Sequence, residues 1–432
     1  MPAGKFGASS DRSPRCQHTG IIGLQCYGTI SVYAYLLIGR FHSMRCPVPL
    51  PHIIVLAPLS LLMLIPSLVS TQASPSPSVE EFEMGPGDTP AAEGRVVDTA
   101  VLAQFKEEYG AAQEAPRPVF EKYLPRVGAA ALLDVLEETY PACHAQAHDL
   151  GKALFAAHQD LGAALRACGT RCTSGCMHGA VAEAFGNSTL AVLTAQMNTF
   201  CDHGEMARLH KPGNCAHALG HALMFVTGGD VRQSVDACLG FAHEALQYYC
   251  ATGVYMEKIL TGPPLTTPPP SWHYPCDEET LFPAACYRYK AVELLDRFDS
   301  AAQLTHECLG LEAPQRRGCF HGLGHAMAAE VFADPSQLAP LCNHGSHTEQ
   351  VVCIEGAIEK LAEYDEERAT AACSSLDDAL QPVCERAVSD KMYSLTKATL
   401  ALYYDRDRVV QRRTVLATTK SAGATPSPDR SQ

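Results

Sequence analysis

The chain has 432 residues, with 33 Lys and Arg against 47 Asp and Glu, so its formal net charge is −14. An acidic chain without a basic block is a poor nucleic-acid binder, because contact with phosphates needs clustered Lys and Arg. Its hydrophobic content of 47% is too high for a disordered acidic chain. The unusual feature is 19 Cys beside 18 His, which is typical of an oxidising compartment or of a metal protein.

The N-terminal region is predicted to be a targeting segment. Residues 53–69 are the only long apolar run, and the run is shorter than the roughly 20 residues of a membrane-spanning helix. Read from Met44, a short basic start, this apolar run and small residues up to Ala73 form a secretory signal peptide, with residues 1–43 as an upstream extension. We therefore expect a secreted or lumenal protein with no stable membrane span after cleavage. The alternative is a signal anchor that tethers the protein to a membrane, facing an oxidising compartment.

Polar segments flank the predicted folded domain, residues 97–405. Residues 74–96 are rich in Pro and Ser and are expected to be a linker, and residues 406–432 are expected to be a disordered polar tail. Cleavage after Ala73 would change the net charge to −18. Asn187 begins an Asn-Ser-Thr triplet, which is a glycosylation acceptor in a eukaryotic secretory pathway.

Within the predicted domain, segments that open with cysteine recur at a period near 34 residues and have a helical composition. Such a period predicts stacked helix–turn–helix units. We expect an all-α fold of about eight units, an α-solenoid that either stays open or closes towards a toroid. The units open at Cys143, Cys176, Cys215, Cys250, Cys286, Cys319, Cys353 and Cys384.

A second cysteine precedes each unit after the first, 8 to 14 residues upstream, and ends a helical stretch. Zinc sites are the alternative to disulfides, but thiolate zinc ligands usually come as CxxC pairs, and the chain has none. With a signal peptide upstream, disulfides are favoured. The predicted pairs are Cys168–Cys176, Cys201–Cys215, Cys238–Cys250, Cys276–Cys286, Cys308–Cys319, Cys342–Cys353 and Cys373–Cys384, with the remaining Cys143–Cys172 as the eighth.

The junction from Ala167-Cys168 to Gly175-Cys176-Met177-His178-Gly179 resembles the disulfide-bridged Sel-like repeat proteins, a cysteine-rich secreted family of αα-hairpins. In that family a hairpin ends in Ala-Cys, a short turn follows, and Gly-Cys-x-x-Gly opens the next helix. The resemblance covers most of residues 140–400 through spacing and glycine, whereas the gaps are mostly longer and the family's Leu-Gly and Tyr positions are largely missing. It implies a helical-repeat fold and a binding or scaffold role.

Three of the unit-opening segments carry two histidines four residues apart, which places both imidazoles on one helix face where they can share a metal ion. Positions two and six after each cysteine face away from the disulfide, towards the inner surface of the array. Imidazole combined with carboxylate suits iron, zinc or manganese. The predicted metal ligands are His144, His148, His178, His217, His221, His321, His325, Glu355 and Glu359.

Units six and seven are neighbours, so His321, His325, Glu355 and Glu359 are expected to meet as one cluster of two imidazoles and two carboxylates. The histidines of units one to three would lie about 30 Å or more away along a straight array. They join that site only if the array closes or folds back. Three glutamates seven positions after a cysteine are expected to be structural: Glu183, Glu257 and Glu293.

These features support three functions. The first is a metal-dependent enzyme, an oxidoreductase or hydrolase, whose catalytic residues the sequence does not identify. The second is a metal carrier or sequestering protein. The third is a scaffold whose concave face binds a protein or peptide, with the histidines serving as packing residues. We expect metal binding, with or without catalysis.

Overall fold

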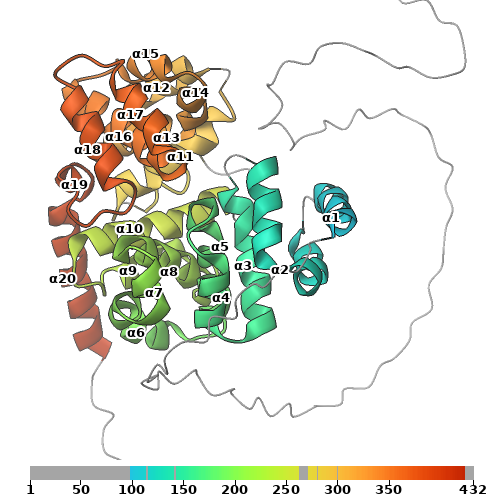
Figure 1. Cartoon of the computed structure of the whole chain (residues 1–432). Coiled ribbons are helices and arrows are strands. Elements are labelled where there is room, and N and C mark those ends of the chain that lie inside the picture. The colour runs from blue at the N-terminus through green and yellow to red at the C-terminus, as the bar shows by residue number, and fades with distance from the viewer. Residues whose placement is uncertain are drawn as a thin grey trace, which may run out of the picture. The chain divides into compact units, whose positions relative to one another are not determined.

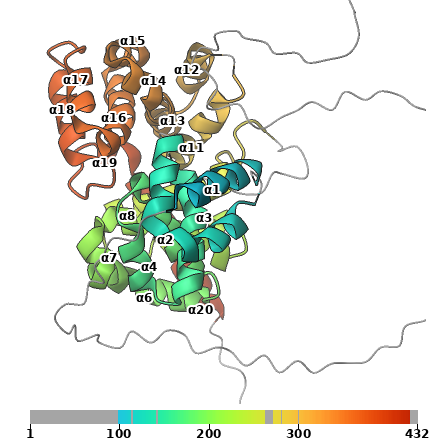
Figure 2. The ribbon, with the colours of Figure 1, turned by 45° about the vertical axis from the view of Figure 1, so that its right-hand side comes forward.

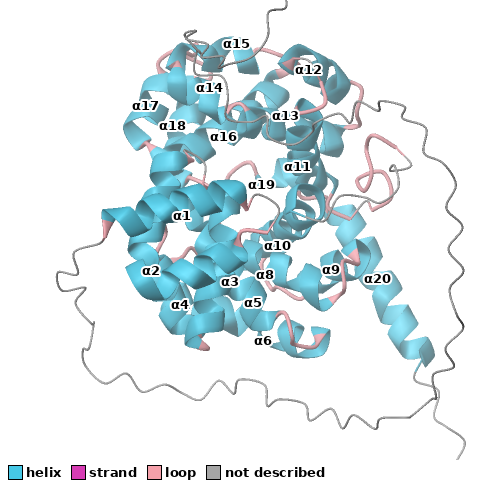
Figure 3. Cartoon of the chain, turned by 90° about the vertical axis from the view of Figure 1, so that its right-hand side faces the viewer, coloured by secondary structure: helices cyan, strands magenta, loops and turns pink. Residues whose placement is uncertain are grey.

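The computed structural model describes residues 98–112, 115–140, 143–261, 271–279, 281–298 and 300–423. Within these ranges the regular structure is helical and contains no β-strand (Figure 3), which confirms the all-α prediction. A search of the same residues finds no helix with the length and apolar character needed to cross a membrane. The predicted signal peptide and linker lie outside the described residues.

Eight helices carry the unit-opening cysteines, either within the helix or, for α3, at its N-cap. Each of these helices contacts the next one in chain order. Figures 1 and 2 show the first four grouped together and the last four in a second group, and α10 contacts α11 between them. We call them the ladder helices: α3 (His144–His158), α5 (Gly175–Phe185), α8 (Pro212–Val226), α10 (Glu244–Met256), α11 (Pro283–Leu295), α13 (Ala313–Ala326), α16 (His347–Tyr364) and α18 (Gln381–Asp390).

Further helices connect or flank the ladder helices. Five of them begin at an Asp, Ser or Thr whose side-chain oxygen accepts a hydrogen bond from the backbone N–H three residues later, which satisfies one of the free donors of a helix start. The α-helices of this set are α1 (Thr99–Ala111), α2 (Arg117–Thr139), α4 (Leu161–Cys168), α6 (Leu190–Asp202), α7 (Gly204–Leu209), α9 (Val231–Cys238), α12 (Ala301–Leu309), α14 (Ala328–Ala333), α15 (Leu338–Cys342), α17 (Glu366–Cys373), α19 (Leu400–Tyr403) and α20 (Arg406–Gly423). Three single turns complete the set: η1 (Cys172–Ser174), η2 (Glu257–Thr261) and η3 (Pro335–Gln337).

All eight predicted cysteine pairs are joined by disulfides. Seven of them connect the segment before a ladder helix to that helix across 8 to 14 residues, and the eighth, Cys143–Cys172, spans 29 residues. Each closed loop restricts the unfolded chain and stabilises the fold by about 2–3 kcal/mol. The disulfides therefore compensate for the small apolar area that one helical hairpin buries alone.

Glycines allow neighbouring ladder helices to approach each other at the histidine positions. A Cβ atom added to Gly179 of α5 would overlap the carbonyl oxygen of His148 in α3. Gly253 of α10 lies in the same way against the carbonyl oxygen of His217 in α8. Because only glycine lacks a Cβ, these two positions set how closely the next helix lies to each histidine pair.

The C-terminal segment differs from its prediction as a disordered polar tail, because residues 406–423 form helix α20. Val409 is buried, and Arg412 forms two short contacts with Asp236 of α9, Nε to Oδ1 at 2.6 Å and Nη2 to Oδ2 at 3.0 Å. Arg406 pairs with Glu244 at the start of α10. The prediction was wrong for this segment because its polar composition conceals ion pairs to residues more than 150 positions earlier. Residues 424–432 lie outside the described residues.

Candidate metal centre

Five histidines from three successive ladder helices form one group, which we call the five-histidine cluster: His144 and His148 of α3, His178 of α5, and His217 and His221 of α8. Neighbouring rings in the group have centroids 4.8–5.6 Å apart. Four of the five side chains are at most 6% exposed, and His144 is half-buried. The structure therefore brings together the predicted ligands of units one to three.

The pair on α8 has both Nε2 atoms directed at each other. The Thr252 hydroxyl donates to the Tyr249 carbonyl oxygen, so its oxygen accepts from Nδ1–H of His217 at 2.8 Å. Nδ1–H of His221 donates to Oε2 of Glu257 at 2.8 Å. In the neutral rings the two Nε2 lone pairs therefore face each other at 3.2 Å. Without a proton or a cation between them, this arrangement is repulsive.

This spacing fits a shared metal ion. Imidazole nitrogens bind zinc at about 2.0–2.1 Å, so two nitrogens 3.2 Å apart subtend an angle of about 100° at a shared ion. That angle lies between the octahedral and tetrahedral values. A carboxylate and a hydroxyl on the outer nitrogens are also the usual means by which proteins fix the tautomer of metal-binding histidines.

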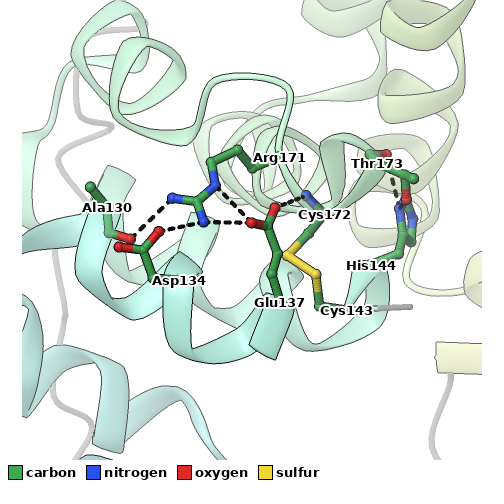
Figure 4. The surroundings of a disulfide bond; sticks show 8 residues. All are labelled: Ala130, Asp134, Glu137, Cys143, His144, Arg171, Cys172 and Thr173. Atoms are coloured by element: carbon green, nitrogen blue, oxygen red, sulfur yellow. Dashed lines mark hydrogen bonds and ion pairs between the residues drawn. A yellow bond between two sulfur atoms is a disulfide. The ribbon is translucent and has the colours of Figure 1, made fainter. Parts of the chain in front are cut away.

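The pair on α3 repeats this geometry, with Nε2 of His144 and His148 also 3.2 Å apart. The turn of residues 172–174 supports it and has positive φ at all three positions, which is costly for residues with a side chain. The disulfide to Cys143 and a 3.2 Å hydrogen bond from its own backbone N–H to Glu137 hold Cys172 in this turn. Thr173 then offers its carbonyl oxygen at 3.1 Å and Oγ1 at 3.0 Å to Nδ1 of His144 (Figure 4).

His178 lies close to both pairs. Its Nε2–H donates to Oδ1 of Asn214 at 2.8 Å. Its Nδ1 is buried and has no hydrogen-bond partner among the described residues. With each pair, His178 forms a set of three imidazoles whose ligand atoms lie within 4.8 Å of one another.

Four imidazoles of the cluster are uncharged without a metal: those of His144, His148, His178 and His217. Burial lowers the pKa of His144 to about 3. Burial, and then repulsion by a neighbouring imidazolium, holds the pKa of His148, His178 and His217 well below the usual value. These rings are neutral at physiological pH, which is the form that binds metals.

The cluster predicted from units six and seven is assembled in part. Ligand atoms of His321 in α13 and of Glu355 and Glu359 in α16 lie within 4.8 Å of one another. Lys397 forms an ion pair with Glu359, and its Nζ lies 4.0 Å from Oε1 of Glu355. Tyr403 also donates to Glu355 at 2.5 Å. A buried ammonium group therefore already compensates these carboxylates.

The expected fourth member, His325, lies outside that group. Its Nε2 is 3.3 Å from Nζ of Lys360, and its ring is 6.3 Å from that of Tyr289. Lys360 and Glu257 hold equivalent positions, each seven residues after the cysteine of its own unit. Each contacts the second histidine of the preceding unit: Glu257 contacts His221, and Lys360 contacts His325. An ammonium group thus takes the place of the carboxylate that orients His221, so His325 has no matching support for a metal.

Sequence reasoning missed the groups that orient the imidazoles: Thr173, Asn214, Thr252 and Glu257. Glu257 was expected to be structural, whereas its carboxylate contacts His221. Thr252 and His217 hold the same position in successive units, two residues after the unit cysteine. This equivalence is a sequence signal that could have predicted their contact. Asn187, the predicted glycosylation acceptor, is exposed in the turn between α5 and α6.

Comparison of the chain with protein-family models, curated proteins and solved structures finds no match. Conclusions about the site therefore rest on its geometry.

Proposed function

We propose that this protein binds a transition-metal ion, zinc or iron, at the five-histidine cluster. The observation that carries the proposal is the facing of the His217 and His221 Nε2 lone pairs at 3.2 Å, with both Nδ1–H groups engaged on the outside. Imidazole ligands suit zinc and iron better than manganese, which prefers carboxylate and water. Because eight disulfides fit an oxidising compartment, we place this metalloprotein outside the cell or in a lumen.

We propose further that the metal serves catalysis, as in a metal-dependent hydrolase or oxidoreductase. Each histidine pair with His178 offers three imidazoles. Three protein ligands leave a coordination position for water or substrate, which is the arrangement of catalytic zinc sites, whereas storage and structural sites fill all positions. The five-histidine cluster therefore favours an enzyme over a carrier.

The finer description of the fold belongs to the same proposal. We interpret the ladder helices as eight repeated hairpin units of a solenoid related in plan to the Sel-like proteins. The support is the contact of each ladder helix with the next and the recurrence of the disulfide at each step. In this interpretation the histidines repeat because the unit repeats.

The test is the metal content of full-length protein purified without a histidine tag, measured by mass spectrometry before and after equilibration with zinc or iron(II). We expect at least one equivalent of bound metal. The double variant His148→Gln/His178→Gln should lose it, because each possible set of three ligands in the cluster contains one of these histidines and glutamine offers no imidazole. Circular dichroism and free-thiol titration would show that the variant is folded and fully oxidised.

His321→Gln is the matched control, because His321 lies on a ladder helix at the position equivalent to His178 and beside carboxylates that Lys397 already compensates. It should retain the metal. Substoichiometric metal in the wild type, or equal metal in the double variant, would overturn the proposal and leave the scaffold function. Loss of metal in His321→Gln alone would move the site to units six and seven.

A further inference from the structure

Arg288 on α11 is a buried cation that forms no ion pair with a carboxylate among the described residues. Its side chain is 2% exposed, and its Nε has no hydrogen-bond partner among the described residues. An Nη2 contact of 3.6 Å to the sulfur of Met392 and the ring of Tyr289, 5.7 Å away, do not supply a negative charge. A buried guanidinium without a counter-ion is strongly unfavourable, so this residue needs an anion.

Lys360 on α16 is a second cation, and its side chain is half-buried. Its Nζ lies 3.3 Å from Nε2 of His325, and no described carboxylate forms an ion pair with it. Burial, and then repulsion from Arg288, lowers the pKa of Lys360 to about 8. Arg288 and Lys360 therefore repel each other, and neither forms an ion pair with a described carboxylate.

This region borders the five-histidine cluster. The ring of Tyr289 lies 6.3 Å from the ring of His217 on one side and 6.3 Å from that of His325 on the other. Lys360 also contributes, after burial and His221, to the lowered pKa of His144. An anion held by Arg288 and Lys360 would thus lie beside the proposed metal.

The carboxylates of α16 do not supply this counter-charge. Glu355 and Glu359 are engaged by Lys397, Tyr403 and Thr399. Glu257, at the edge of the five-histidine cluster, is engaged by His221. The guanidinium of Arg288 in a low-dielectric interior therefore still lacks a counter-charge from these carboxylates.

We propose that Arg288 and Lys360 bind a small oxyanion, a carboxylate or a phosphate, next to the five-histidine cluster. The planar guanidinium of Arg288 can donate to two oxygens of either group at once. The ammonium group of Lys360 can donate a third hydrogen bond to the same anion. The proposal rests on the proposed metal function, because it names the substrate class of that same interior. It predicts that the enzyme acts on a small anionic molecule.

The experiment titrates full-length protein of measured metal content with inorganic phosphate and with acetate, by calorimetry and by the shift in melting temperature. We expect saturable binding of at least one anion. Arg288→Met and Lys360→Met should each weaken it by about tenfold or more while the metal content stays unchanged. Comparing the two anions distinguishes a phosphate site from a carboxylate site.

Lys290→Met is the matched control. Lys290 is a buried lysine on the same helix as Arg288, but it is paired with Glu293 at 2.6 Å, so its removal should leave anion affinity unchanged. Should Arg288→Met not fold, Arg288→Lys keeps the charge, loses the planar fork and should still weaken binding.

Absence of binding for both anions, or wild-type affinity in Arg288→Lys and Lys360→Met, would overturn the oxyanion proposal. A different result would show that only the metal proposal fails: the protein would contain no metal, but anion binding would still require Arg288 and Lys360.

Discussion

Nδ1 of His221 on α8 lies 2.8 Å from Oε2 of Glu257, at the junction of α10 and η2. His221 is 1% exposed, so the carboxylate acts on a ring that has no access to bulk water. A carboxylate on the outer nitrogen of a metal-binding imidazole fixes the ring orientation and raises the basicity of the inner nitrogen. Glu257 is therefore placed to orient the imidazole of His221, and a carboxylate oxygen of Glu257 also lies within 4.8 Å of ligand atoms of His148 and His221.

We expect Glu257→Ala to lower metal affinity by about 10–100-fold, the usual effect of removing such a partner. Glu257→Gln should lower it less, because the amide oxygen still accepts the hydrogen bond but carries no charge. Competition with a chromophoric chelator measures both affinities.

Glu293→Gln is the control for this series. Glu293 also lies seven positions after a unit cysteine, but it pairs with Lys290 and Arg297. The metal affinity of Glu293→Gln should equal that of the wild type. Equal affinity in Glu257→Ala as well would mean that the His221–Glu257 contact has no role in binding.

Gly179→Ala is expected to damage the fold and the cluster together. The added Cβ would meet the backbone oxygen of His148, which cannot move like a flexible side chain, so α5 must shift away from α3. Overpacking of this kind costs about 1–3 kcal/mol. Denaturant unfolding should show this loss, and chelator competition should show weaker metal binding.

Gly110→Ala in α1 is the comparison, because nothing lies within 4 Å of a Cβ added there. Alanine is about 1 kcal/mol better than glycine in a helix, so this variant should be as stable as the wild type or more stable. If both alanine variants behave alike, close approach at Gly179 does not set the position of α5.

The cysteine pattern made the fold predictable to an unusual degree. A disulfide restrains two Cα atoms to about 5–6 Å. The regular spacing of the cysteines along the chain therefore also predicts which helices are neighbours. One example is Cys238–Cys250, which joins α9 to α10. The histidine pairs were predictable for a similar reason, because a spacing of four fixes one helix face.

The orientation of the imidazoles was not predictable from those spacings. Glu257 reaches His221 only because α10 lies close to α8, and that closeness depends on Gly253 against the His217 backbone. The prediction of His325 as a metal ligand failed for the same reason. Its surroundings depend on whether the next helix has Glu or Lys at the facing position, and that residue is Lys360. The His217/His221 pair is thus supported by a negatively charged residue, Glu257, whereas the His321/His325 pair has the positively charged Lys360 at the equivalent position.

Removal of the disulfide Cys143–Cys172 should affect stability and metal binding together. The double variant Cys143→Ser/Cys172→Ser opens a loop whose ends are 29 residues apart, and it is expected to lose about 3.6 kcal/mol of stability. It also releases the turn that holds Thr173 against Nδ1 of His144. We expect a lower unfolding midpoint and weaker metal binding.

Cys373→Ser/Cys384→Ser should separate the two effects. This pair links α17 to α18, away from the five-histidine cluster, so stability should fall while metal affinity stays unchanged. If both double variants lose the same affinity, the role of the 172–174 turn at His144 would be wrong and the loss would reflect general loosening.

His210 makes the stability of the metal-free protein dependent on pH. It is 6% exposed, its Nε2 has no hydrogen-bond partner among the described residues, and burial lowers its pKa to about 4. The unfolded chain binds a proton near pH 6.5 and the folded chain only near pH 4, so stability is complete above pH 6.5 and falls as the pH drops between these values. The loss reaches roughly 3 kcal/mol at pH 4. His210→Gln should remove that part of the pH dependence, so denaturant unfolding at pH 7 and pH 4.5 should show a smaller difference in the variant, and an equal difference would contradict the assignment.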